Sequence, residues 1–514
     1  MKTRNLLLTF LLLSMMLLPV TAQDAFNWPY KIDNGVIKTE VPVRPSGQQD
    51  VLNLRTPKLS VVRVGFVGLG MRGHEAVRRW IYQEGVQIVG LCDHEADRVK
   101  SSNAQLRKAG LPPAAEYSGE DGYKALCERQ DVDLIYIATD WLHHVPVAKY
   151  AMEHGKHVAI EVPSAMTLRD CWDLINLSEK TRLHCFMLEN CCYDFFELNT
   201  MYMAQKGLFG EVMFGAGAYR HCLDPFWDEY WKNGPDDKLG WRLDYNMRYR
   251  GDVYATHGLG PVAQLMNIHR GDRFLTLSAM DTKSVRGKAI AEKKLGHSID
   301  NFRQGDITNT MIRTANGKMI QIMHSTTIPQ PYNRMFQIVG TEGMANKYPV
   351  EGYSLTHNSM VKGGIQKHGN YWEGEEYLPK EDYDQLVSKY TSPMVTKYEK
   401  KAKEVGGHGG MDFIEDSRLV YCLQHGLPMD IDVYDLAEWC SLAELGSLSM
   451  DHGCLPVEVP DFTRGHWKDQ KGYQHYYATE AEEEAQDKAN HEFTLKLKAS
   501  AEKLWKKYDK KNKK

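Results

Sequence analysis

The sequence predicts an α/β protein, in which a doubly wound parallel sheet precedes an α+β domain with a large open, mostly antiparallel sheet. In the first part, a β-branched run at residues 61–67 leads through a glycine-rich turn into a helical pattern at 74–83. Strand and helix patterns then alternate up to about Pro163, which is typical of a parallel sheet. Beyond this point the pattern changes to longer apolar and β-branched segments, spaced like the strands of an open sheet.

The first 22 residues predict a signal peptide, so we expect an exported protein that is periplasmic or secreted. Lys2 and Arg4 precede an apolar run that ends at Leu18, and a pattern of small residues typical of a cleavage site ends at Ala22. The alternative is a membrane anchor, but the apolar run is shorter than the roughly 20 residues that span a bilayer. Residues 23–59 are polar with scattered prolines and predict an N-terminal arm, either ordered or flexible.

Residues 60–185 predict the first domain, because strand-like and helix-like patterns alternate there. After the first strand, further strands are expected at 87–92, 134–138, 157–160 and 184–188. Helical patterns precede the later strands, and one of them covers residues 168–181. These elements predict a sheet with helices between its strands.

Gly68, Gly70 and Gly73 form a G-x-G-x-x-G pattern between the first strand and the following helix. In a dinucleotide site the first glycine permits a tight turn, the second lets the backbone approach a pyrophosphate, and the third lets helix and strand pack closely. Asp93 ends the next strand, 20 residues after Gly73, where a carboxylate binds ribose hydroxyls and repels a 2′-phosphate. The pattern therefore predicts a site for NAD rather than NADP, and a glycine turn without a ligand is the alternative.

Residues 186–477 predict the second domain, which we expect to bind substrate. A helix is expected at 195–206, followed by strands at 211–219, 274–279, 309–314, 319–327 and 335–340. Residues 362–410 are polar and charged without a clear period, and they predict an insertion. Residues 478–514 predict a charged helical tail, acidic first and basic last, which we interpret as a solvated face rather than a binding patch.

Composition argues against several classes of function. A net charge of −4 over 514 residues gives no electrostatic support for binding nucleic acid. The 10 cysteines are scattered and include no C-x-x-C pair, so the sequence predicts no metal site. After the first 22 residues no segment is apolar enough to span a membrane, so we expect a soluble mature protein.

The segment "EVPSAMT" at 161–167, which follows "GKHVAI", resembles the glucose–fructose oxidoreductase / inositol dehydrogenase / MocA superfamily. In that superfamily a Glu-Lys-Pro motif closes a Rossmann domain, and a domain with an open-faced sheet follows. This sequence has Val162 in place of the usual catalytic lysine, and Val253 in place of an aspartate four residues before His257. Both departures argue against ordinary alcohol oxidation.

The departures have a closer match in glycoside hydrolase family 109, which contains NAD-dependent α-N-acetylgalactosaminidases. The matching segments occur in order over most of the mature chain: "GLGMRG", "EVP-AMT", "MLENCCYDFFE", "GWRLDYN", "RGDVYATHGLGP" and "GGHGGMDF". The resemblance implies an NAD-dependent glycosidase that acts on N-acetylhexosaminides, above all terminal α-N-acetylgalactosamine. It also implies that NAD stays tightly bound and is recycled.

The mechanism implied by this resemblance starts with oxidation of the sugar hydroxyl at carbon 3, which hands a hydride to NAD. The new ketone acidifies the proton at carbon 2, a base removes that proton, and the glycosidic oxygen leaves by elimination. Water then adds to the enone, and the hydride returns to the sugar. This chemistry needs proton donors and acceptors around one ring, rather than the two flanking carboxylates of an ordinary glycosidase.

The resemblance also implies which residues bind the cofactor. Met71 and Arg72 lie at the pyrophosphate turn with Gly68 and Gly70, and Asp93 lies at the ribose. The remaining implied cofactor residues are Trp141, Leu142, His143, His144, Glu161, Val162 and Asn190. For His143 and His144 the alternative is a structural role at the start of a helix.

The family positions implied for substrate binding are Tyr219, Arg242, Tyr254, Ala255, Thr256, His257 and Tyr332. Tyr254 and His257 are three residues apart and share a face if this segment is helical, and we expect both to act in catalysis. Arg242 offers a planar fork for an acetamido carbonyl or for ring hydroxyls.

Tyr193 and His408 are two further candidates for acid or base catalysis. For Tyr193 the alternative is packing in the core. Four glycines flank His408 in "VGGHGGMDF", which predicts a mobile loop that delivers a proton to the leaving glycosidic oxygen. For this segment the alternative is a flexible linker.

Three functions stay open at this point: an NAD-dependent glycosidase, a sugar dehydrogenase of the same superfamily, and a non-catalytic sugar-binding protein that retains the cofactor fold. Val162 and Val253 argue against the second. The expected partner is a small molecule or glycan with a terminal N-acetylhexosamine, and nucleic acid is not expected. Because exposed sheet faces in this superfamily commonly pair, the resemblance also allows a homo-oligomer.

Overall fold

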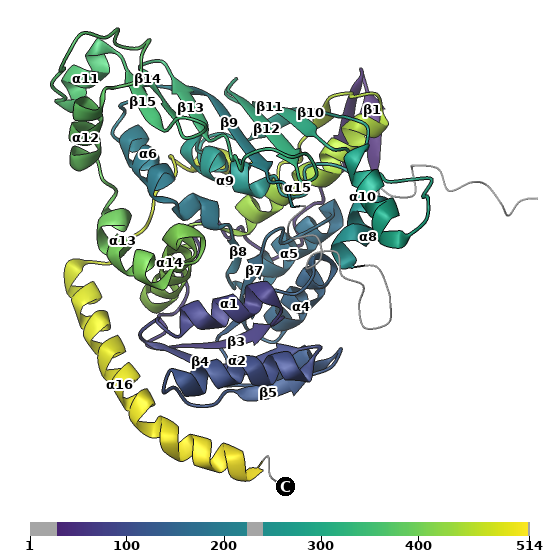
Figure 1. The fold of residues 1–514 in the computed structure, drawn as a ribbon, viewed down its shortest axis with the longest axis vertical. Helices are drawn as coiled ribbons and strands as arrows, with labels where there is room; N and C mark the ends of the chain where they lie inside the picture. The colour runs from purple at the N-terminus through teal and green to yellow at the C-terminus, as the bar shows by residue number, and fades with distance from the viewer. Residues whose placement is uncertain (1–27, 224–239, 512–514) are drawn as a thin grey trace, which may run out of the picture.

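The computed structural model describes residues 28–223 and 240–511 of the 514-residue chain, and Figure 1 shows their arrangement. Two sheets, of six and ten strands, form the frame of the molecule. The predicted signal peptide and the last three residues of the predicted tail lie outside the described residues. Within the described ranges, no helix is both long enough and apolar enough to cross a membrane.

The six-stranded sheet is parallel throughout and has the strand order β5-β4-β3-β6-β7-β8. Its strands are β3 (Val62–Val67), β4 (Val86–Asp93), β5 (Ala115–Ser118), β6 (Leu134–Ile137), β7 (His157–Glu161) and β8 (Cys185–Leu188). This sheet confirms the predicted parallel domain, although β5 was not predicted because its four residues are only partly buried or exposed. The strand order reverses between β3 and β6, and doubly wound sheets bind their ligands at that point.

Helices pack against this sheet (Figure 1), namely α1 (Met71–Trp80), α2 (Ala96–Lys108), α3 (Gly122–Cys127), α4 (Trp141–Glu153) and α5 (Leu168–Thr181). Every residue of β6, β7 and β8 is buried, which explains why these strands are apolar without alternation. The Trp80 ring packs edge-on against Phe66 and Tyr136, with centroid distances of 5.6 and 5.8 Å. This packing holds α1, which begins directly after the glycine turn, against the sheet.

The ten-stranded sheet has the order β1-β2-β16-β10-β11-β12-β9-β13-β14-β15. Its strands are β1 (Tyr30–Asp33), β2 (Val36–Thr39), β9 (Val212–Arg220), β10 (Phe274–Asp281), β11 (Thr308–Thr314), β12 (Met319–Ser325), β13 (Gln337–Gly340), β14 (Gly343–Asn346), β15 (Gly352–Leu355) and β16 (Val457–Glu458). The pairs β9–β12 and β2–β16 are parallel, and the other pairs are antiparallel. The predicted open, mostly antiparallel sheet is confirmed.

The predicted N-terminal arm contributes to the second domain. Strands β1 and β2 form a hairpin at the edge of the ten-stranded sheet, and Ile37 on β2 is fully buried. Asn34 and Gly35 in the turn both have positive φ, as two-residue hairpin turns favour. This pairing was not predicted, because β16, the partner of β2, comes near the other end of the chain.

Helices α9 (Thr256–Leu265) and α15 (Val433–Asp451) cover the face of the large sheet that is turned toward the first domain (Figure 1). Glycines let α9 lie very close to β9. A Cβ at Gly217 would lie 2.1 Å from the Gly258 carbonyl oxygen, and a Cβ at Gly258 would lie 2.1 Å from the Ala218 nitrogen. Since only glycine fits at these two positions, the close approach places His257, the residue before Gly258, directly beside β9.

The predicted insertion at 362–410 contains helical structure. Three α-helices overlap it: α11 (His357–Gly363), α12 (Lys380–Lys389) and α13 (Pro393–Val405). Only a few side chains of α12 and α13, such as Leu386, Met394 and Val405, are buried. The helical period is therefore hidden in a largely charged sequence.

The predicted charged tail is helical, and one of its faces packs against the first domain (Figure 1). It forms α16 (Glu480–Lys511), in which the Trp505 indole donates a hydrogen bond to the Leu111 carbonyl oxygen at 2.8 Å. The Arg107 guanidinium lies 4.1 Å from the centroid of the same indole.

The remaining elements are η2 (Asn190–Tyr193), α6 (Phe195–Gln205), α8 (Trp241–Arg248), α10 (Arg286–Leu295), η4 (His408–Gly410), α14 (Met411–His425) and η5 (His466–Asp469).

Candidate active site

The glycine turn between β3 and α1 has the geometry of a phosphate-binding turn. Gly68 has a φ of +89°, and a Cβ there would lie 2.5 Å from the Ala138 backbone, while a Cβ at Gly73 would lie 1.8 Å from the Gly68 carbonyl oxygen. At Gly70, by contrast, a Cβ would meet nothing within 4 Å. The first turn of α1 has no acidic residue and Gly70 offers no side-chain cap, so its backbone N–H groups are suited to an anion.

Asp93 is held beside this turn at the end of β4. Its Oδ2 accepts a hydrogen bond from the Leu69 backbone N–H at 2.5 Å, and its Oδ1 accepts one from the Glu95 N–H at 2.8 Å. Arg98 also donates to Oδ1 from Nη1 at 3.4 Å, so Oδ2 is the oxygen with a further lone pair for another donor. Asp93 therefore lies directly beside the glycine turn, and its contact with ribose hydroxyls stays a prediction.

Four of the predicted substrate residues meet where β9, α8 and α9 come together. The Tyr254 ring stacks on Tyr219 with centroids 4.8 Å apart, and the His257 ring lies 5.2 Å from each of them. Arg242 donates from Nη2 to the Tyr254 hydroxyl at 2.9 Å, and its guanidinium lies 4.9 Å from the Trp141 ring centroid. Trp141, which was predicted to bind the cofactor, thus joins these four residues. We call the five residues together the substrate cluster.

His257 lies in the first turn of α9, and Tyr254 lies in the turn just before it. The Nδ1 of His257 is 2.7 Å from Oε1 of Glu189 and 3.4 Å from the sulfur of Cys191. Burial alone would raise the pKa of Glu189, but His257 lowers it below its usual value, so Glu189 is a carboxylate and accepts the hydrogen bond. The Nε2 atom has no hydrogen-bond partner among the described residues, which suits it to contact substrate.

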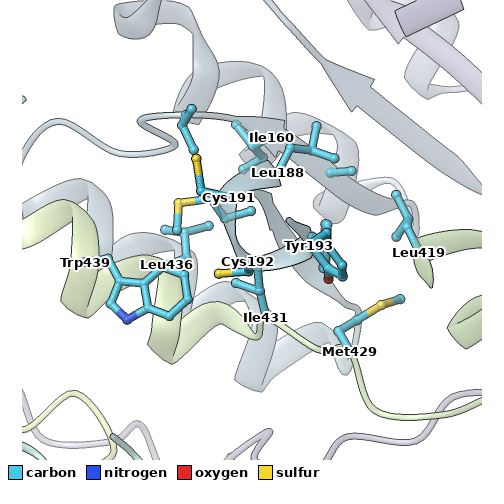
Figure 2. Packing of buried hydrophobic residues seen from close by; sticks show 14 of the residues in the cluster. Ile160, Leu188, Cys191, Cys192, Tyr193, Leu419, Met429, Ile431, Leu436 and Trp439 are labelled. Atoms are coloured by element: carbon cyan, nitrogen blue, oxygen red, sulfur yellow. The ribbon is translucent and has the colours of Figure 1, made fainter. Parts of the chain in front are cut away.

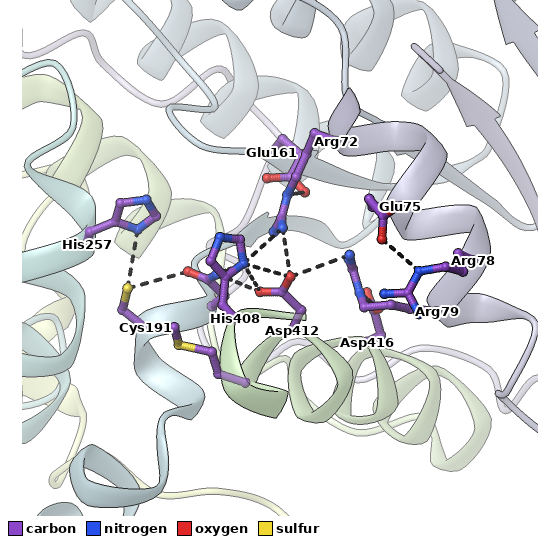
Figure 3. A network of polar contacts seen from close by, with 12 residues as sticks. Arg72, Glu75, Arg78, Arg79, Glu161, Cys191, His257, His408, Asp412 and Asp416 are labelled. Atoms are coloured by element: carbon purple, nitrogen blue, oxygen red, sulfur yellow. Dashed lines mark hydrogen bonds and ion pairs between the residues drawn. The ribbon is translucent and has the colours of Figure 1, made fainter. Parts of the chain in front are cut away.

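A second group of predicted residues meets around Asp412, as Figure 3 shows. Arg72 pairs with Glu161 through Nε at 2.6 Å and with Asp412 through Nη1 at 2.7 Å. Asn190 donates from Nδ2 to Oδ1 of Asp412 at 2.6 Å, and Nδ1 of His408 lies 2.9 Å from Oδ2 of Asp412. Three predicted residues, Arg72, Asn190 and His408, therefore share the Asp412 carboxylate, which was not among the predicted site residues.

Two arginines keep this shared carboxylate ionised. Burial alone would raise the pKa of Asp412, but Arg72 and Arg79 hold it well below its usual value. The next carboxyl groups along α14 differ, because burial raises the pKa of Asp416 to about 6 and that of Glu415 well above its usual value. Asp412 is thus the stably charged member of this acidic segment.

The glycine-flanked histidine lies on a tightly turned segment. Gly406, Gly407, Gly409 and Gly410 all have positive φ, and His408 itself has a φ of +46°. The four glycines therefore serve this unusual backbone path, which other residues adopt only with strain. The His408 side chain is 58% exposed, so its ring reaches the surface although Nδ1 faces Asp412.

Tyr193 lies outside both clusters. Figure 2 shows its ring among buried side chains that include Leu419 and Met429, and the residue is 1% exposed. Its hydroxyl donates to Oδ2 of Asp430 at 3.3 Å. The structure therefore supports core packing for Tyr193 and not the predicted role in proton transfer.

The two neighbouring histidines of α4 have different environments. His144 is buried, with Nδ1 at 2.9 Å from the Pro163 carbonyl oxygen and Nε2 at 3.1 Å from that of Thr139. It thus has the structural role at the helix start, and its side chain is not free for the predicted cofactor contact. His143 is exposed, and its Nδ1 lies 2.6 Å from Oδ2 of Asp140, which also caps the helix.

Most of the other predicted residues are sequence neighbours of residues in the two clusters. Ala255, Thr256 and Val162 are buried, while Met71 and Leu142 are more than half exposed. The Tyr332 ring is 43% exposed and packs edge-on against His221 with centroids 5.1 Å apart. Tyr332 is therefore placed at the rim of the substrate cluster, because the His221 ring in turn lies 5.7 Å from the Tyr219 ring.

Two known protein families match the chain, one over each of its two domains. A family described as oxidoreductase family, NAD-binding Rossmann fold, matches residues 62–188. A family described as glycosyl hydrolase 109, C-terminal domain, matches residues 193–469. The first match, the open position at Gly70 and the placement of Asp93 together identify NAD as the cofactor, which the turn at 68–73 would hold.

Individual proteins give the same result over nearly the whole chain. Glycosyl hydrolase family 109 protein 5 of Phocaeicola vulgatus is 60% identical over 495 residues, covering 96% of this chain and 94% of that protein. Glycosyl hydrolase family 109 protein 1 of Bacteroides thetaiotaomicron is 54% identical, covering 89% and 97%. A crystal structure of an oxidoreductase from Agrobacterium radiobacter in complex with NAD+, L-tartaric acid and magnesium has a TM-score of 0.53. It is 18% identical and covers 77% of this chain and 98% of that one, so it shows the fold alone.

We expect the wild-type protein to purify with NAD bound, and Asp93→Ala to retain less of it. Loss of hydrogen bonds to a charged acceptor costs about 1.5–3 kcal/mol, which corresponds to roughly 10- to 100-fold weaker binding. The measurement is the NAD content of the supernatant after denaturing the purified protein. Asp97→Ala is the matched control, because Asp97 lies nearby on α2 with its side chain 96% exposed. Equal NAD contents in wild type and Asp93→Ala would contradict the ribose assignment.

Asp252, in the loop before Tyr254, is expected to make stability depend on pH. Burial raises the pKa of this carboxyl from 3.8 to about 7, although Thr310 donates a hydrogen bond to it. The folded state therefore binds a proton that the unfolded state has lost between pH 4 and 7, so stability falls as pH rises through this window. Asp252→Asn removes this loss, which amounts to about 4 kcal/mol.

The check is urea unfolding of wild type and Asp252→Asn at pH 5 and pH 8. The variant should gain stability relative to wild type at pH 8 and not at pH 5. Asp272→Asn is the matched control, because Asp272 is equally buried but accepts hydrogen bonds from the Thr314 hydroxyl and two backbone N–H groups. An unchanged pH dependence in Asp252→Asn would show that Asp252 is ionised in the folded state.

Proposed function

The chain belongs to glycosyl hydrolase family 109, and we propose that this NAD-dependent glycoside hydrolase removes terminal N-acetylhexosamine, above all α-linked N-acetylgalactosamine. The proposal rests on one observation: a single short segment, Glu189–Cys191, connects the two residue clusters. Glu189 binds the imidazole of His257 in the substrate cluster. Asn190 binds Asp412, which also binds Arg72. The group suited to move protons therefore lies next to the residues at the cofactor turn.

When bound, NAD supplies reversible oxidation of the sugar hydroxyl at carbon 3, which makes the proton at carbon 2 acidic. The chain itself must then remove that proton and protonate the leaving oxygen. His257 is suited to the first task, because Nδ1 is bound by Glu189 while Nε2 is free among the described residues. His408 is suited to the second task, because its ring is anchored by Asp412 at Nδ1 and exposed elsewhere.

Arg242 supports the choice of an N-acetylated sugar. Its guanidinium is packed against Trp141, Trp241 and Tyr254, with 4.9 to 5.2 Å to their ring centroids. A stacked guanidinium is held in one plane, which suits a planar acetamido carbonyl better than a flexible amine would. Tyr219 and Tyr254 add a stacked aromatic surface, with which the apolar face of a sugar ring is compatible.

We also propose that the protein acts outside the cytoplasm. The proposal is supported by the cationic start, the apolar run and the cleavage pattern within residues 1–22. Mass spectrometry of the protein from cell fractions tests it. A mature form that begins at Gln23 outside the cytoplasm is expected, and a full-length cytoplasmic form would contradict it.

Hydrolysis of p-nitrophenyl α-N-acetylgalactosaminide without added NAD tests the proposed function. Release of nitrophenol is expected, because the cofactor is retained and recycled. Accumulation of NADH with free N-acetylgalactosamine would instead indicate a sugar dehydrogenase. Absence of both, in protein that contains NAD, would indicate a binding protein.

A further inference from the structure

The buried carboxylate of Glu189 is the closest polar partner of the imidazole at the substrate cluster. Its Oε1 lies 2.7 Å from Nδ1 of His257, and its side chain is fully buried. The same oxygen accepts a hydrogen bond from the Cys191 backbone N–H at 3.1 Å, which fixes the carboxylate at the start of η2. A carboxylate held in this way binds one particular tautomer of the histidine, with the proton on Nδ1.

Packing around Glu189 prevents the side chain from moving away. Helix α9 contacts η2, and a Cβ at Gly260 would lie 3.1 Å from Cγ of Glu189 and 2.8 Å from the Trp439 ring. Glycine at this position thus makes room for the carboxylate between α9 and α15. The histidine is constrained on its other side by the rings of Tyr219 and Tyr254.

Cys191 gives the same three residues a second interpretation, as ligands of a metal ion. One ligand atom each from Glu189, Cys191 and His257 lies within 4.8 Å of the others. However, the Arg334 guanidinium donates to the Cys191 sulfur at 3.1 Å, and burial raises the pKa of this thiol well above its usual value. A protonated thiol beside a buried cation disfavours a metal ion, so the geometry favours proton transfer.

We propose that Glu189 is a positioning residue, which holds His257 with Nε2 unprotonated and facing the substrate. This inference rests on the proposed function, because that function defines the reaction. The contact between Glu189 and His257 does not depend on it. When Nε2 takes the proton from carbon 2, the resulting imidazolium is stabilised by the Glu189 carboxylate, which keeps its negative charge. The proton later returns from Nε2 to carbon 2 when water adds to the enone, and no proton passes to Glu189.

Glu189→Gln is the sharpest variant, because it keeps the shape of the side chain and removes the charge. We expect kcat to fall by about 100-fold, with KM and NAD content unchanged, because binding does not need the charge. Glu189→Ala should lose more, because it also removes the hydrogen bond. In protein with ¹⁵N-labelled histidine, both variants should shift the Nδ1–H resonance of His257, which is assigned by its loss in His257→Ala.

The matched control is Glu438→Gln at a second buried histidine–carboxylate pair. Nε2 of His269 lies 2.5 Å from Oε2 of Glu438, and both side chains are 2% exposed. Burial lowers the pKa of His269, but Glu438 raises it to about 9, so this control pair is held by charge. Glu438→Gln should lower the stability of the folded protein. It should leave unchanged the kcat per NAD-containing molecule and the Nδ1–H resonance of His257.

Two results would overturn the inference. One is an unchanged kcat in Glu189→Gln. The other is a decrease in kcat that is equal in Glu189→Gln and Glu438→Gln after both values are corrected for NAD content. Failure of the proposed function is distinguishable, because wild type would then release no nitrophenol while the resonance still reports on the contact. A resonance that is unaffected in Glu189→Ala would refute the contact in either case.

Discussion

His257→Ala is expected to lower kcat by about 1,000-fold on p-nitrophenyl α-N-acetylgalactosaminide while the protein keeps its NAD. The reason is that His257 is the imidazole beside the Tyr219 and Tyr254 rings, whereas the glycine turn and Asp93 lie on β3, β4 and α1. Removing the side chain deletes a proton acceptor but no group of the dinucleotide turn. Turnover and NAD content are measured on the same preparation.

Tyr254→Phe provides a second variant in the same cluster, because it removes only the hydroxyl to which Arg242 donates at 2.9 Å. It should also retain NAD and lose turnover. Exchange of the carbon-2 proton with deuterated solvent should be lost in His257→Ala if this residue is the base. Equal loss of NAD in Asp93→Ala, Tyr254→Phe and His257→Ala would mean that the last two belong to the cofactor site.

His408→Ala should reduce kcat by about 100- to 10,000-fold on alkyl or sugar glycosides and far less on the p-nitrophenyl glycoside. A poor leaving group needs a proton as it departs, while p-nitrophenolate leaves readily without one. The ring of His408 is anchored to Asp412 through Nδ1 and is 58% exposed, so it has both a fixed position and an open face. The measurement is the ratio of kcat values on the two substrate types.

His357→Ala is the matched control, because His357 is also an exposed histidine with a carboxylate partner, Glu373 at 3.1 Å, but lies on α11. It should leave both rates unchanged. In His408→Ala, exchange of the carbon-2 proton should survive, since oxidation and enolisation precede departure of the leaving group. Equal losses on both substrate types would argue against an acid role, and unchanged kinetics would assign the glycine-rich segment a structural role.

The fold was predictable where the chain has a local, periodic pattern. The helix expected at 168–181 is α5 (Leu168–Thr181), because its apolar residues recur on one face and Thr167 caps its start. The strands of the parallel sheet were predictable because both faces are buried, which makes them continuous apolar runs. Helices α12 and α13 were not predictable in this way, because few of their side chains are buried.

The site was predictable where its residues lie close together in the sequence. The three glycines and Asp93 form one strand–turn–helix–strand unit, in which the backbone conformation follows from the missing Cβ atoms. Residues separated along the chain were harder to assign. Tyr193 resembled an acid or base candidate, but its neighbour Asp430 lies 237 positions later and accepts its hydroxyl in the core.

Local sequence was therefore sufficient for the fold class and the NAD turn, whereas the choice of His257 came from the family resemblance. Only the folded chain shows that Glu189 is the partner of His257, that Asp412 joins Arg72, Asn190 and His408, and that β2 pairs with β16. The physical reason is that backbone conformation and burial leave a periodic pattern over a few turns of chain. A contact between two polar side chains from distant segments leaves no such pattern, because it depends on how helices and strands pack.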